Sequence, residues 1–118
     1  MRFRNAAIAA SAAIAVLATA PAAQAKRLSQ DEVVRTMVDR PITTKRMGMT
    51  VNLRFASNGV VTAKALIGTY KGKWRRGGGD AICTTFPTGP AKGTQCVTYS
   101  QIGKNRYRTS GGTVFTVR

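Results

Sequence analysis

Apolar and polar residues alternate along most of this chain, and a period of two predicts half-buried β-strands. The clearest case is "MTVNLRF", residues 49–55, in which every second position is apolar. Segments of the same kind are separated by Gly, Pro or Asn, which favour turns. The predicted strands are residues 49–55, 60–67, 69–76, 81–86, 95–102, 106–110 and 113–117.

One segment before these strands has helical periodicity instead. Ser29 and Glu32 match a capping box, and the apolar residues within 33–38 recur at helical spacing. Pro41 disfavours helical dihedrals in the residue before it. The sequence therefore predicts one short helix at about residues 30–39.

Short strands at regular spacing, with a turn between neighbours, predict an antiparallel meander. The expected fold class is mainly β: a small meander barrel or sandwich of about seven strands with one short N-terminal helix. The helix would plug one barrel end or cover an open edge. Tyr70 and Trp74, together with several Val and Ile, are predicted to face inward and nearly to fill a barrel of this size.

The first residues predict a secretory signal peptide, residues 1–25. Two arginines precede an apolar stretch at 6–20, and a small-x-small site ends at Ala25. The stretch is shorter than the roughly 18–20 residues of a spanning helix, which disfavours a membrane anchor. We therefore expect residues 26–118 to be a single β-rich domain, periplasmic or secreted from a bacterium.

Cys83 and Cys96 are the two cysteines of the chain. An even number of cysteines in an exported protein favours a disulfide. The alternatives are a two-ligand metal site and a reactive thiol, but the chain has no His to complete either. We expect a disulfide, no metal and no cofactor.

The sequence offers little for catalysis. Acid–base chemistry usually uses His or a carboxylate of shifted pKa, and the chain has no His and only four acidic residues. The glycine-rich stretch "RRGGGD", residues 75–80, lacks the Lys-Ser/Thr of a phosphate-binding loop. The protein is therefore predicted not to be an enzyme.

Charge gives the strongest functional signal, because the net charge is +15. Such an imbalance attracts anions from a distance. Outside the cytosol the available polyanions are lipopolysaccharide, acidic polysaccharide and phospholipid head groups, whereas cytosolic nucleic acid is not expected as a partner. The candidate polyanion-binding residues, most of which alternate on outward strand faces, are Lys71, Lys73, Arg75, Arg76, Arg106 and Arg108.

The stretch "GKWRRGGGDAICTTF", followed by "GTQCVTY", resembles a loose group of small secreted bacterial proteins of unknown function. Members share a signal peptide, a short helix with an acidic start and this Gly-x-Trp…Cys…Cys segment. Some are labelled dihydrodipicolinate reductase, but no residues of this sequence support that label. The resemblance implies a small β-rich envelope protein with scaffold positions at Gly72, Trp74, Cys83 and Cys96.

The sequence thus predicts a monomeric, non-catalytic binding or structural protein of the envelope, which binds anionic polymers through a basic sheet face. The alternative is a protein-binding, inhibitor-like module that presents the loop "PTGPAKGT", residues 87–94. A carrier of a small ligand and an enzyme are less favoured. The charges also have a plain structural interpretation, in which they only keep the wet face of a sheet soluble and unpaired.

Overall fold

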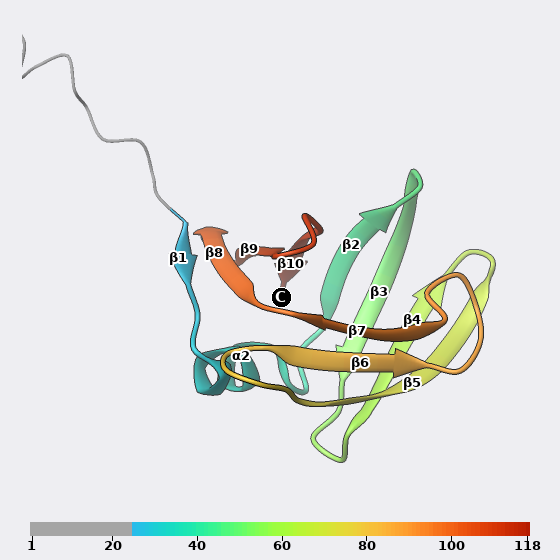
Figure 1. The fold of residues 1–118 in the computed structure, drawn as a ribbon. Helices are drawn as coiled ribbons and strands as arrows, with labels where there is room; N and C mark the ends of the chain where they lie inside the picture. Colours follow the sequence, from blue (N-terminus) through green and yellow to red (C-terminus); the bar gives the residue numbers. More distant parts are fainter. Residues whose placement is uncertain (1–24) are drawn as a thin grey trace, which may run out of the picture.

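The computed structural model describes residues 25–118, which form one curled antiparallel sheet and one short helix (Figure 1). The predicted signal peptide lies outside the described residues, apart from Ala25. The helix is α2 (Gln30–Met37). The strands are β1 (Lys26–Arg27), β2 (Ile42–Arg46), β3 (Met49–Phe55), β4 (Val60–Ala65), β5 (Gly68–Arg76), β6 (Ile82–Phe86), β7 (Gly93–Val97), β8 (Tyr99–Gly103), β9 (Arg106–Thr109) and β10 (Val114–Val117).

The strands follow the order β1-β8-β9-β10-β2-β3-β4-β5-β6-β7, and each neighbouring pair is antiparallel. β2 to β7 form a continuous meander, and β8 to β10 return to lie beside β2. The sheet curls into a half-barrel (Figure 1). The predicted class, mainly β with one short helix, is confirmed, but the predicted count of about seven strands is wrong.

Two of the additional strands, β1 and β2, lie where the sequence predicted no strand. The sequence pattern did not predict β2, because its turn into β3 is formed by Met47 and Gly48, at φ 52° and 77°. In a two-residue hairpin turn of type I′ both central positions have positive φ, and a Met there is uncommon. The turn signal in "RMGM" was therefore hidden in the sequence.

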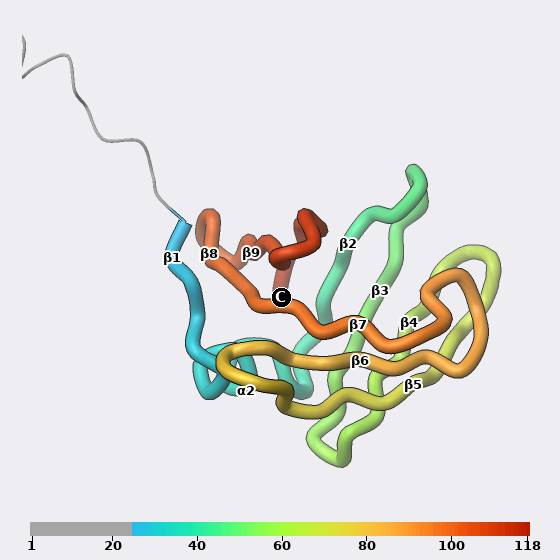
Figure 2. The backbone as a smooth tube through the Cα atoms, viewed as in Figure 1, coloured from blue at the N-terminus to red at the C-terminus, as the bar shows by residue number. Residues whose placement is uncertain are grey.

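The third additional strand arises because the predicted strand 95–102 is divided at Thr98. Figure 2 shows the chain running from β7 into β8 without a turn, yet β7 pairs with β6 and β8 pairs with β9. Thr98 connects the two strands along the chain. It is held in place by Ser110, whose N–H donates to the Thr98 carbonyl at 2.9 Å. The alternation of side chains continues through this corner, so the sequence pattern did not reveal it.

The helix α2 begins as predicted and ends early. Ser29 Oγ accepts from the Glu32 N–H at 3.2 Å, and a Glu32 carboxylate oxygen accepts from the Ser29 N–H at 3.0 Å, which confirms the capping box. The helix ends at Met37 rather than near residue 39, because the backbone of the C-cap residue Val38 is extended, with ψ 134°; Asp39 follows with a left-handed φ of 61°.

α2 covers one end of the half-barrel, as the sequence allowed. The Gln30 side-chain amide donates to the carbonyls of Gly77 and Ala81, at 3.1 and 2.8 Å, which ties the helix start to the β5–β6 turn. We call this the closed end: it comprises α2, the β3–β4 turn (56–59) and the β5–β6 turn (77–81).

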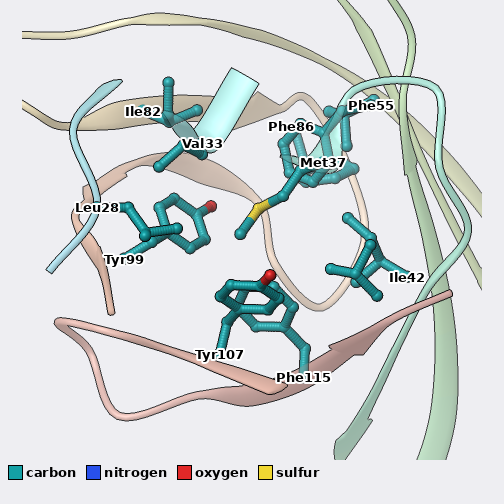
Figure 3. Packing of buried hydrophobic residues seen from close by; sticks show 12 residues of the cluster. Leu28, Val33, Met37, Ile42, Phe55, Ile82, Phe86, Tyr99, Tyr107 and Phe115 are labelled. Atoms are coloured by element: carbon teal, nitrogen blue, oxygen red, sulfur yellow. The ribbon is translucent and has the colours of Figure 1, made fainter. Parts of the chain in front are cut away.

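The core lies behind the helix, in the closed half of the barrel (Figure 3). Met37 extends from α2 toward the aromatic side chains of β8 to β10 (Figure 3). The Tyr107 and Phe115 rings stack with centroids 5.7 Å apart, and Phe115 meets Tyr99 edge to face at 5.5 Å. Burial of large apolar side chains here supplies the main stabilisation of the fold.

The predicted disulfide is confirmed: Cys83 of β6 is bonded to Cys96 of β7. Cys83 is buried although it lies on the outer face, because Gly77 packs against its sulfur. A disulfide fits an oxidising compartment outside the cytosol. In residues 25–118 no helix has the length and apolar character required to cross a membrane.

Candidate binding surfaces

The outer face of β5 presents a row of cations. Lys71, Lys73 and Arg75 are exposed and point outward, since they alternate with residues that face inward. Same-face residues along a strand lie about 6.6 Å apart, twice the rise per residue. The predicted outward alternation on this strand is therefore present in the structure.

Two neighbouring strands extend this row into a surface. In the register of the sheet, Arg54 of β3 is opposite Thr62 of β4, and Thr62 is opposite Lys71. Lys64 lies diagonally beside Lys71, because its own partner on β5 is Thr69. The strands β3, β4 and β5 contain no Asp or Glu. We define the basic face as Arg54, Lys64, Lys71, Lys73 and Arg75.

The other predicted cations do not join this surface. Arg76 faces the helix and forms an ion pair with Asp31. Arg106 and Arg108 are exposed on β9, and four strands, β10, β2, β3 and β4, separate them from β5 in the sheet. The six candidate residues therefore divide into a cluster of three, a helix contact and a separate pair.

Gly72 and Trp74, the predicted scaffold positions on β5, are both packed closely against neighbouring segments. A Cβ on Gly72 would come within 2.3 Å of the Thr85 carbonyl oxygen and 2.9 Å of the Phe86 ring, so no side chain fits. The Trp74 indole N–H donates to the Ala56 carbonyl at 2.7 Å, and its ring meets Phe55 edge to face. Trp74 thus fastens β5 to the closed end.

The second feature is an apolar cavity of about 220 Å³ on the inner side of the half-barrel. Its floor is the aromatic core, including Phe86, Tyr99 and Phe115, and its walls are the inner faces of β2 to β4. The Tyr99 hydroxyl is neutral at physiological pH, because an ordinary tyrosine ionises only near pH 10 and burial raises the pKa of Tyr99 further, to about 12. The floor is therefore uncharged.

The expectation that Tyr70, Trp74 and the inward Val and Ile nearly fill the barrel is wrong, since a cavity of about 220 Å³ remains. Trp74 lies under the helix, beside Val33 and Ile82. The Tyr70 ring packs against Gly89, where a Cβ would lie only 2.6 Å from it. The inward positions of the adjacent strand β4 hold the small residues Ala63 and Ala65, so the space beside them is not filled.

The cavity opens at the end away from α2. We call this the open end: it comprises the β2–β3 turn (47–48), the β4–β5 turn (66–67) and the β6–β7 loop (87–92). Three large apolar side chains are exposed there, Met47 at 87 %, Leu66 at 94 % and Ile67 at 57 %. Arg46 also lines the cavity, and it is the one charged residue among the described residues that do so.

The acidic residues all lie at the closed end. Asp31 and Glu32 belong to α2, the Asp39 carboxylate accepts from the Ser57 N–H at 3.3 Å, and Asp80 pairs with Arg27. The hydrogen bond from Arg76 lowers the pKa of Asp31, and the hydrogen bond from the Ser29 N–H lowers the pKa of Glu32. Each of the four carboxylates thus has a structural role, in a helix cap, a hydrogen bond or an ion pair.

Neither feature brings together a set of metal-ligating side chains in the part of the chain that the structure describes. Within residues 25–118 no three His, Cys, Asp or Glu side chains gather where they could hold a metal ion. Comparison of the chain with protein-family models, with curated proteins and with solved structures gives no match. The two surfaces are therefore interpreted from their own geometry.

The sequence does contain a sign of the cavity, namely small and charged residues at inward positions, but hydrophobic periodicity alone does not reveal it. Ala63 and Ala65 occupy inward positions of β4, where a filled barrel needs larger side chains. Arg46 occupies an inward position of β2, after Ile42 and Thr44. Only the pairing of the strands shows that these residues surround one cavity.

Proposed function

We propose that this chain is an exported, non-catalytic binding or structural protein of the bacterial envelope, and that its basic face binds anionic polymers. The observation that carries the proposal is the grouping of five outward cations on three adjacent strands that contain no carboxylate. The disulfide supports a periplasmic or secreted location.

The physics of such a surface is that of a polyelectrolyte contact. Each cation that neutralises an anionic group releases a counterion, so the affinity falls as salt rises. The flexible ammonium groups of Lys64, Lys71 and Lys73 act as point charges without fixed hydrogen-bond geometry. The surface therefore suits a repeated phosphate, sulfate or carboxylate better than one defined small ligand. Lipopolysaccharide, acidic polysaccharide and phospholipid head groups carry such groups.

Retention on immobilised heparin across a salt gradient tests the proposal. The variant Lys71→Glu/Lys73→Glu reverses two charges of the basic face. Arg106→Glu/Arg108→Glu is the matched control, since it makes the same change in net charge at the same spacing on β9. We expect the β5 variant to elute at clearly lower salt than the control, and lipopolysaccharide binding to follow the same order.

Equal elution of the two variants would show that net charge alone governs retention, and the basic face would then have no specific role. The alternative function, a protein-binding module that uses the loop 87–94, makes a different prediction. A partner captured from envelope extract through that loop would remain bound at high salt, whereas a polyanion would dissociate.

A further inference from the structure

The cavity is large enough and apolar enough to hold part of a ligand. An apolar cavity of about 150 Å³ stays dry and takes up benzene-sized molecules, whereas pockets for drug-sized ligands begin near 300 Å³. The cavity of this protein, about 220 Å³, lies between these limits. It therefore fits a small apolar group or one end of an alkyl chain, not a bulky ring system.

The rim extends the apolar surface beyond the cavity. Met47, Leu66 and Ile67 stand exposed at two hairpin tips, and Pro90 and Ala91 line the mouth from the neighbouring loop. Exposed apolar side chains gathered at one end of a small domain mark an interaction site. A chain that leaves the cavity would continue along these residues.

The mouth of the cavity is positively charged, which favours an anionic group at the solvent-facing end of a ligand. Arg46 follows Ile42 and Thr44 on the inner face of β2, so its guanidinium stands where the apolar wall meets solvent. The three ion pairs within residues 25–118 use other cations. Lys45 and Lys92 are exposed at the same end, while the four acidic residues are at the opposite end.

We propose that the open end binds a single-chain amphiphile with an anionic head group. The alkyl chain occupies the cavity between β4 and the aromatic floor, and Arg46 pairs with the head group at the mouth. A planar guanidinium forms bidentate, charge-assisted hydrogen bonds to phosphate or carboxylate. This site is separate from the basic face, which lies on the outer side of the sheet.

Calorimetric titration of the full exported domain tests the proposal, with dodecyl phosphate as the probe below its micellar concentration. We expect saturable binding, weaker by at least about tenfold for the neutral dodecyl maltoside and undetectable for inorganic phosphate. The variant Lys71→Glu/Lys73→Glu should leave the affinity unchanged, which separates this site from the polymer-binding face.

Two pairs of variants locate the ligand. Ala63→Phe fills the cavity and should abolish binding, whereas Thr62→Phe on the outward side of the same strand should not. Ala65→Phe, nearer the mouth, replaces the first variant should Ala63→Phe fail to fold. Arg46→Gln should weaken dodecyl phosphate binding about five- to tenfold, and Lys45→Gln, which faces outward, should not.

The proposal is overturned by any of these results: dodecyl phosphate does not bind, it binds the cavity-filling variants as tightly as it binds the parent, or the neutral amphiphile binds as tightly as dodecyl phosphate. Light scattering covers the remaining possibility, a second copy of this chain on the apolar rim. A dimer that excludes the probe would also overturn the proposal.

Discussion

The closed and open ends of this half-barrel are built from the same strands but differ in packing and charge. At the closed end, α2 lies over the aromatic core, and Met37 and Ile42 are only 2 % and 1 % exposed. At the open end the same strands carry Ala63, Ala65 and exposed Met47 around an unfilled cavity. A small domain has little apolar surface to bury, and this one concentrates its burial at one end.

The contrast shows how a thin core can leave an open cavity in a stable sheet. The disulfide and the four carboxylates lie at or near the closed end, next to the helix and the turns that hold it. The open end is made of hairpin tips and one loop, where side chains contribute less to stability. In the proposal made above, stability and ligand binding therefore belong to opposite ends of one sheet.

Two methionine truncations provide the largest test of this contrast. Met37→Ala removes a buried side chain from the closed end and should lower the free energy of unfolding by about 2–5 kcal/mol. Met49→Ala changes a half-exposed residue that lines the cavity, and it should cost less than about 1 kcal/mol. Urea denaturation followed by the emission of Trp74 measures both. Equal costs would contradict the division into a packed and a hollow end.

Removal of the disulfide should have the next largest effect. Cys83→Ser/Cys96→Ser opens a loop with a sequence separation of 13 residues, which should cost roughly 3 kcal/mol on the chain-entropy account. The same denaturation experiment measures it, with the oxidised parent as reference. A loss below about 1 kcal/mol would mean that packing alone holds β7 to β6.

Tyr99, on the floor between the two ends, should make stability sensitive to alkali. Burial raises the pKa of Tyr99 to about 12, while in the unfolded chain the hydroxyl ionises near pH 10. Its contribution is therefore complete below about pH 10 and is lost as the pH rises through about 12, because the unfolded state releases its proton first. Tyr99→Phe should remove this component. An unchanged alkaline profile in that variant would show that the hydroxyl is not protected.

The smallest expected effect is acid sensitivity at the closed end. The pKa of Asp31 and of Glu32 is lowered in the folded protein, by Arg76 and by the Ser29 N–H respectively. Their contribution is present above their usual values of 3.8 and 4.5 and is lost as the pH falls through the lower folded values. Asp31→Asn should flatten the decline of thermal stability below about pH 4.5. A decline as steep as in the parent would assign it to other groups.

The sequence predicted local features and missed those that depend on strand pairing. The capping box at Ser29 and the alternation along β3 to β6 need only neighbouring residues, and both are present. The Cys83–Cys96 bond is also present, and it followed from the cysteine count rather than from strand pairing. The corner at Thr98 preserves the alternation while its hydrogen-bond partners change, so periodicity cannot show it.

The candidate site divides in the same way. Periodicity gave the outward face of Lys71, Lys73 and Arg75 correctly, because it depends only on position along one strand. It could not tell that four strands separate Arg106 and Arg108 from β5, nor that Arg54 and Lys64 complete the surface. The cavity is a difference between the volume enclosed by the curled sheet and the side chains that fill it, and only the closed geometry gives that difference.

Chemical-shift mapping by NMR tests the account most directly. Dodecyl phosphate titrated into the ¹⁵N-labelled domain should shift the amide resonances of Arg46, Val51 and Ala63 at the open end, and leave those of Val33 and Trp74 unchanged. Shifts confined to Lys71, Lys73 and their outward neighbours, or spread evenly over both ends, would contradict the assignment of ligand binding to the open end.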